Sequence, residues 1–432
     1  INTFKIISMP KLEKFFFYNY LIIVFPIFFI IGSAAINLIL IIISLIMLYE
    51  LFKKKNYIKS NLILLLLFGI LYIYWIFIAI LAEDSLKSLQ SSISQLRFFL
   101  FAVFISIFFK PEIFFKYLIQ VWSVVILLVC IDTNIQLFTG IDIFGYKAEG
   151  HAYDHRVFLS PHIGRLSGPF GDELVVGAFL AKISAPIILF YLYKIQSSTK
   201  KFEIIKPILL LCLIYESVII SGERTSLIII STVFLVYFII KTDIKKILLL
   251  LFSIFIIISI FYSSNVFIKS RVNDTVKIVS NISNSSYGRI YNSSITLWKE
   301  NVILGTGFKN YHVNCNKLKD PNPSHKHAYC SPNHAHNTFL QLLSETGLLG
   351  LLLFYLFFGY ILKVFYQNKK RLKLYKKEYK NFLIGSSVIV VYHLIPSPVP
   401  AGSFFSTWNA TFFWLQLGLL MTLLNNEHDI NI

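Results

Sequence analysis

The run NLILLLLFGILYIYWIFIAILA, from Asn61 to Ala82, contains no charged residue. An α-helix rises about 1.5 Å per residue, so a run of this length can cross the roughly 30 Å hydrocarbon core of a bilayer. Similar runs recur along most of the chain. We therefore predict an all-α membrane protein that crosses the bilayer many times.

The composition agrees with this prediction. The chain has 432 residues, of which 56% are hydrophobic and only 14% are charged, whereas soluble domains carry about a quarter charged residues. We predict twelve membrane-spanning helices, near residues 16–32, 36–52, 61–82, 97–109, 117–137, 173–193, 207–221, 225–240, 247–263, 338–362, 381–397 and 405–424.

The net charge of +18 is explained by topology rather than by nucleic acid. Lys and Arg concentrate in alternate loops, which marks those loops as cytoplasmic and places both termini there. The basic, cytoplasmic segments are residues 1–15, 53–59, 110–116, 194–206, 241–246 and 363–380. The short loops on the opposite side carry only three basic residues, Lys87, Arg97 and Arg224.

Two longer loops, residues 138–172 and 264–336, fall on the outer side. The second has an excess of six basic over acidic residues, which indicates an anionic ligand at the membrane surface or attraction to acidic lipid headgroups. We therefore divide the chain into nine spans in residues 1–263, a periplasmic loop domain in residues 264–336, and three spans in residues 337–432.

The four cysteines separate into two groups. Cys130 and Cys212 lie inside predicted spans and are expected to be packing residues. Cys315 and Cys330 lie in the large outer loop, where an oxidising compartment favours a disulfide. A metal site is the alternative for this loop, because imidazole is a common zinc ligand. The histidines there are His325, His327, His334 and His336.

Three arginines lie next to predicted spans. Arg224, in SGERTSLIII, occupies a tight turn between two spans, and Arg165 precedes another span in GRLSGPFGDE. Arg289 lies in a predicted amphipathic helix. The alternative is that each is an ordinary solvated or snorkelling arginine. Inside the spans, Lys182 and Glu216 could pair with each other or mark a site.

In the predicted helix containing Arg289, the apolar face comprises Tyr287, Tyr291, Ile295, Trp298 and Val302. The opposite, polar face comprises Arg289, Ser293, Thr296 and Glu300.

The segment NHAHNTFLQLLSETGLLG places His334 and His336 directly before a span. The pattern Thr338-x-x-Gln341 predicts a capping box at the helix start. The positive end of the helix dipole favours a neutral imidazole, which can accept a proton, and also attracts anions such as phosphate. We expect the two imidazoles to point in opposite directions, with His336, nearer the helix, facing the site.

Together these segments resemble the O-antigen ligase and O-antigen polymerase superfamily of bacterial envelope glycosyltransferases. The matching pieces are RLSGPFGDE, SGERTSL, GRIYNSSITLWKENVILGTGF and NHAHNTFLQLLSETGLLG. The resemblance implies a multi-pass protein of the bacterial inner membrane, with its active site at the periplasmic face. It also implies transfer of a glycan from undecaprenyl diphosphate to an acceptor, either the lipid A core or another glycan.

Carried onto this sequence, the family pattern makes His336, before Asn337, the catalytic base, and it places Arg224 and Arg289 on the diphosphate. Arg165, His334 and Asn337 are further candidates. The implied reaction is inverting and needs no metal or other cofactor. The cysteine pair and His325/His327 lie outside the family pattern. O-antigen polymerase is the alternative within the family, and a flippase or transporter of lipid-linked oligosaccharides is the alternative outside it.

Overall fold

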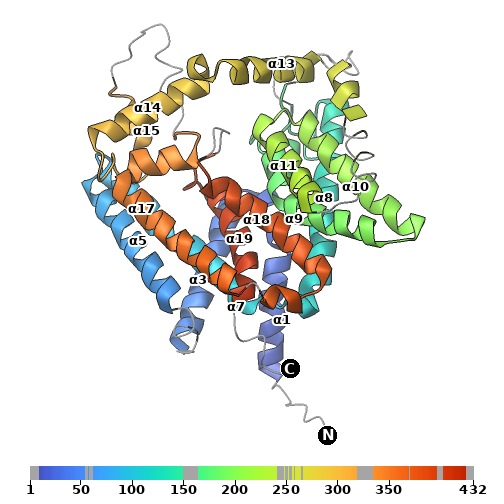
Figure 1. Cartoon of the computed structure of the whole chain (residues 1–432), viewed down its shortest axis with the longest axis horizontal. Coiled ribbons are helices and arrows are strands. Elements are labelled where there is room, and N and C mark those ends of the chain that lie inside the picture. Colours follow the sequence, from blue (N-terminus) through green and yellow to red (C-terminus); the bar gives the residue numbers. More distant parts are fainter. Residues whose placement is uncertain are drawn as a thin grey trace.

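The structure is a computed structural model that describes residues 9–53, 57, 62–148, 164–240, 248, 252, 255–256, 258–263, 266–318, 334–368, 370–396 and 402–424. Within these ranges the regular structure is helical, apart from an isolated β-bridge between Ile141 and Lys147. The predicted all-α membrane architecture is confirmed (Figure 1). The principal helices are α1 (Met9–Ile23), α2 (Phe25–Ile31), α3 (Ser33–Lys53), α5 (Leu62–Leu81), α6 (Ser85–Ile93), α7 (Leu96–Phe108), α8 (Pro111–Thr139), α9 (Val176–Ser197), α10 (Lys201–Ile220), α11 (Arg224–Ile240), α13 (Val266–Ser280), α14 (Ser286–Glu300), α15 (Tyr311–Cys315), α17 (Thr338–Gln367), α18 (Lys377–Leu394) and α19 (Thr407–Met421).

Among the described residues, six helices are long and apolar enough to cross a membrane, namely α3, α5, α6 with α7, α8, α9 and α17. Counting α1 and α2, which are bent by 49° at their junction, gives up to seven. α11 is apolar but has 17 residues. The predicted span 247–263 lies largely outside the described residues, so the count of twelve stays a prediction.

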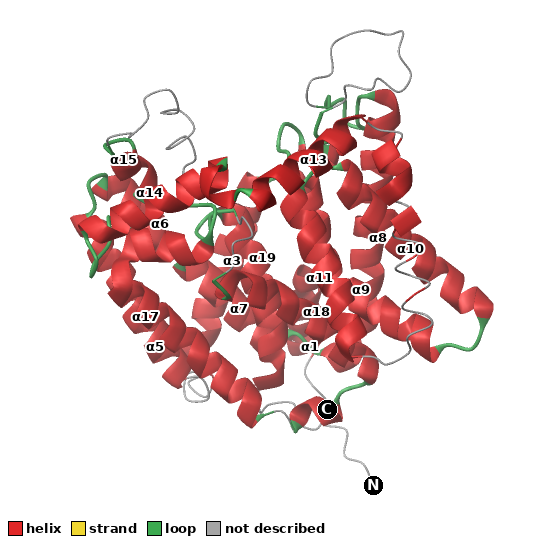
Figure 2. Ribbon diagram, turned by 45° about the horizontal axis from the view of Figure 1, so that its top comes forward, coloured by secondary structure: helices red, strands yellow, loops and turns green. Residues whose placement is uncertain are grey.

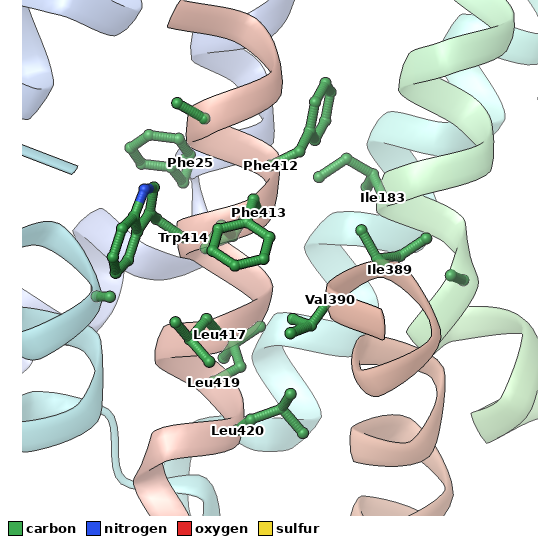
Figure 3. Close-up of a cluster of buried hydrophobic side chains, with 14 of the residues drawn as sticks. Phe25, Ile183, Ile389, Val390, Phe412, Phe413, Trp414, Leu417, Leu419 and Leu420 are labelled. Carbon is green, nitrogen blue, oxygen red and sulfur yellow. The ribbon is translucent and has the colours of Figure 1, made fainter. Parts of the chain in front are cut away.

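α9 and α19 occupy the centre of the bundle. Every residue of α19 from Ala410 to Met421 is buried, as expected for a helix that is apolar on all sides. Figure 3 shows Phe412, Phe413 and Trp414 of α19 between neighbouring helices. Phe412 stacks on Phe29 of α2 with ring centroids 4.0 Å apart. These contacts join α19 to α2 in the core of the bundle.

A glycine allows α18 to approach α9 closely. A Cβ atom on Gly385 would lie 2.4 Å from the carbonyl oxygen of Ala185, beside Pro186. Small residues permit such backbone contact between membrane helices, where packing rather than hydrophobicity drives association.

α17 is interrupted at Gly347, whose backbone has φ 65° and ψ −174°. The segment 302–307 inserts its backbone into the break. Thr306 N donates to Ser344 O at 2.9 Å, and Leu348 N donates to Val302 O at 2.9 Å. The sequence segments LGTG and SETG therefore pair with each other, and the loop before the site is fixed to the start of α17.

We expect Gly347→Ala to destabilise the folded protein by about 1–3 kcal/mol, because this φ/ψ region is essentially restricted to glycine. The new Cβ would also lie 2.2 Å from Ile303 O. Gly359→Ala in the same helix is the matched control, since its Cβ would meet nothing within 4 Å. Thermal unfolding of the purified variants in detergent measures the difference, and equal unfolding temperatures for the two would contradict this account of the break.

Candidate active site

The turn between α10 and α11 begins the site. Gly222 has φ +70°, a conformation that side chains rarely adopt, and a Cβ there would lie 2.8 Å from the Phe267 ring of α13. Arg224 follows as the first residue of α11. Its Nη2 lies 3.5 Å from Asp274 Oδ2 on α13. Arg224 Nε is buried and has no hydrogen-bond partner among the described residues, so the guanidinium keeps donor capacity for a ligand.

Glu223, beside Arg224, is held by the segment before α9. Arg165 Nη2 lies 3.5 Å from Glu223 Oε1 and donates to Leu174 O at 2.8 Å. Ser226 Oγ donates to Glu223 Oε2 at 2.9 Å. Burial raises the pKa of the Glu223 carboxyl, and the Arg165 guanidinium opposes that rise. Arg165 is thus placed close to Arg224 through Glu223.

A third arginine, which the sequence analysis did not select, joins this cluster from α13. Arg271 donates to Gly222 O through Nη2 at 2.9 Å and Nε at 3.2 Å. Burial lowers the pKa of Arg271, and the nearby charges of Arg224 and Arg165 lower it further. Arg271 and Asp274 are one helical turn apart, so they lie on the same face of α13. This spacing identifies Arg271 as a site residue only when α13 is known to cross the turn between α10 and α11.

We call Arg165, Arg224 and Arg271 the arginine cluster. The acidic groups paired with it are Glu223 and Asp274. Figures 1 and 2 both show α13 lying across one end of the bundle, above α11, which brings Arg271 to the turn. A surplus of positive charge at this point suits an anion, because guanidinium groups bind phosphate oxygens through paired N–H donors.

The two histidines lie at the start of α17. Asn337, not Thr338, is the N-cap, and its side chain accepts from Leu340 N at 3.0 Å. The predicted capping box is therefore wrong. Gln341 instead donates to Ser403 Oγ at 2.9 Å and accepts from Phe404 N at 3.0 Å. Asn is preferred over Thr as an N-cap residue, which agrees with the observed start of the helix.

His336 directly precedes this N-cap and has a left-handed backbone with φ 48°. Its ring lies 4.2 Å from the ring of His334, centroid to centroid. The expectation that the two imidazoles point in opposite directions is wrong. In an extended segment adjacent residues alternate, so residues two apart lie on the same side. Both histidines are half-buried.

α14 covers the histidines from the other side. The Tyr287 ring lies 6.0 Å from the His336 ring in an edge-on arrangement. Tyr291, one turn later, hydrogen bonds to the Asn337 side chain, and burial raises the pKa of Tyr291 to about 12. Arg289 lies between these two tyrosines in sequence and is half-buried.

The predicted faces of α14 differ from the observed ones. The buried residues are Gly288, Ile290, Ser293, Ser294 and Leu297. Ser293, assigned to the polar face, is buried because its hydroxyl donates to Arg289 O at 3.0 Å. Ile290 and Leu297 instead pack in a small core with Tyr311, Cys315 and Ala335.

The arginine cluster and the histidines meet around Tyr287. The Tyr287 ring packs edge-on against His336, and Tyr287 also lies within electrostatic range of Arg271. One end of the bundle therefore combines arginines suited to an anionic group with imidazoles suited to accept a proton.

Other candidate residues have separate partners. Lys182 donates to Asn409 Oδ1, whereas Glu216 accepts from Asn134 Nδ2 at 3.0 Å, so the two do not share partners. Among the described residues, no three or more His, Cys, Asp or Glu side chains gather as a metal site. His325, His327 and Cys330 lie outside the described residues.

Cys315 is disulfide-bonded, while Cys130 and Cys212 are free. Pairing of Cys315 with Cys330 stays a prediction. We expect mass spectrometry of non-reduced peptides to find them joined, and detection of both as free thiols would contradict it. Cys315→Ser should lower the stability of the α14–α15 region by roughly 3 kcal/mol, with a smaller effect on transfer than the substitutions in the site.

One comparison with known proteins gives a match to part of the chain. Residues 208–355, from α10 to the middle of α17, match the family model described as O-antigen ligase. This segment is about a third of the chain and includes Arg224, Arg271, Arg289 and His336. No curated protein matches the sequence. The matched segment contains the central features of the site described above, and the match supports a relationship between this chain and the O-antigen ligase superfamily.

Proposed function

We propose that this protein transfers a glycan from undecaprenyl diphosphate to an acceptor hydroxyl on the lipid A core, at the periplasmic face of the bacterial inner membrane. The observation that carries this proposal is the juxtaposition, around Tyr287, of the arginine cluster with the half-buried pair His334 and His336.

His336 acts as the general base in this proposal. It takes the proton of the acceptor hydroxyl while the oxygen attacks the anomeric carbon of the donor glycan. The bond between that carbon and the diphosphate oxygen breaks in the same step, which inverts the configuration. Its position one residue before the N-cap of α17 supports this role, because the helix dipole disfavours a protonated imidazole.

Arg224 and Arg289 neutralise the charge that develops on the departing diphosphate. Guanidinium groups can do this without a metal ion, since they form bidentate hydrogen bonds to phosphate oxygens. The buried, uncommitted Nε of Arg224 supports its assignment. Arg165 pairs with Glu223, and Arg271 donates to the Gly222 carbonyl. We therefore assign these two arginines to positioning the turn that carries Arg224.

O-antigen polymerase is the second candidate, because the family includes both activities and the acceptor is not specified by the described residues. Deletion of the gene followed by gel analysis of surface lipopolysaccharide tests the proposal. Loss of the whole ladder with accumulation of carrier-linked polymer supports a ligase. A core bearing a single repeat supports a polymerase, and an unchanged ladder contradicts both.

A further inference from the structure

A groove of about 340 Å³ lies between α11 and α18. Its walls are Ile228, Ile229, Thr232 and Val236 from α11 and Ser387, Val388, Val391, Tyr392 and Ile395 from α18. Each helix contributes residues over two turns, so the groove extends about 12 Å along the helices. This volume lies at the lower end of the range typical of ligand sites.

The groove is suited to a hydrocarbon chain. The serine and threonine hydroxyl groups on its walls are bonded to their own helices, since Thr232 Oγ1 donates to Ile228 O at 2.8 Å and Ser387 Oγ donates to Ile384 O at 2.7 Å. Ile228, Val391 and Ile395 are 40–54% exposed, so the groove opens on an apolar surface. The O–H donors of these serine and threonine side chains are therefore already used within their own helices.

One end of the groove meets the site. Arg224 lies one helical turn before Ile228 and two turns before Thr232, so the three residues share a face of α11. On the other wall, Tyr392 lies within electrostatic range of Tyr287 and Tyr291 of α14. A lipid whose chain lies in the groove would therefore have its headgroup beside Arg224 and near Tyr287.

We infer that this groove holds the first part of the polyprenyl chain of the donor, with the diphosphate at Arg224. This inference rests on the proposed function and adds the location of the lipid. A diphosphate fits the charge better than a phospholipid headgroup does, because the arginine cluster has three guanidinium groups paired with two acidic side chains. Since lipid tails are as apolar as the groove, its role is to orient the donor rather than to increase its partitioning.

The first test fills the groove with an indole ring in Ile228→Trp and Val391→Trp. The matched control is Leu235→Trp, because Leu235 is 55% exposed on α11 and does not line the groove. Transfer is measured with two donors that carry the same glycan, one on a long polyprenyl chain and one on a short, one-carbon chain that does not reach into the groove. We expect kcat/KM for the long-chain donor to fall about tenfold or more in the groove variants, because misplacing a reacting group is costly. Activity with the short-chain donor, and both activities of the control, should stay near wild type.

The second test is direct. A polyprenyl diphosphate that carries a diazirine on its chain is photolysed with the full-length protein in nanodiscs, and the labelled peptides are mapped. Labelling of α11 and α18 that Ile228→Trp abolishes and Leu235→Trp preserves supports the inference. Labelling elsewhere, or competition by phosphatidylglycerol as effective as by unlabelled polyprenyl diphosphate, would overturn it. Equal loss with both donors in the first test would overturn it too. If the wild-type protein labels in the groove but transfers from neither donor, the proposed function fails while the lipid site stands.

Discussion

His336→Asn is expected to lower the rate of glycan transfer about 10²–10⁴-fold, the usual cost of losing a general base. Asn is the better test than Ala at this position. His336 has a φ of 48°, which Asn tolerates and Ala does not, so the Asn variant removes the base without straining the start of α17. Polyprenyl diphosphate should still bind, because the arginine cluster is intact.

His334→Asn provides the matched control. The two rings are in contact, so this change removes one wall of the His336 environment and we expect a loss of about tenfold or less. The transfer assay is run on both variants with and without EDTA, together with their unfolding temperatures. Equal losses in the two variants, or strong inhibition by EDTA, would replace the base assignment with a metal site. A wild-type rate for His336→Asn would eliminate His336 as the base.

The features that the sequence predicted correctly depend on local patterns. Uncharged runs such as residues 61–82 predict α5 because their length matches a bilayer. The bounds of the apolar runs at residues 207–221 and 225–240 predict the tight turn that contains Gly222 and is followed by Arg224 at the start of α11. The entry of α17 directly after the histidines is likewise local, although its N-cap is shifted by one residue to Asn337.

The features that the sequence did not predict depend on tertiary contacts. The break at Gly347 exists because the backbone of residues 302–307 supplies the hydrogen bonds that the helix loses. Burial of Ser293 is possible because a serine hydroxyl can bond to the carbonyl four residues earlier. Arg271 reaches the site because α13 packs across a turn some 50 residues earlier in the chain, and no pattern within either segment records that contact.

Arg224→Ala is expected to lower transfer about 10²–10³-fold, comparable with removing a donor that stabilises charge in a transition state. The side chain is 20% exposed and presents a buried, uncommitted Nε, so its loss removes N–H donors that water cannot readily replace. Arg224→Lys should recover part of the activity, because an ammonium group restores the charge but not the planar fork. Arg289→Ala should behave in the same way if it shares the diphosphate.

Binding of polyprenyl diphosphate separates this role from that of the base. Arg224→Ala should weaken both the binding of polyprenyl diphosphate and the inhibition of transfer by this product. His336→Asn should leave both unchanged. Lys277→Ala is the control for net charge, since Lys277 is an exposed lysine of α13. Asp274→Ala frees Arg224 from the acid 3.5 Å away and should leave binding equal to or tighter than wild type. Wild-type rates and binding in both Arg224→Ala and Arg289→Ala would show that the diphosphate is neutralised elsewhere.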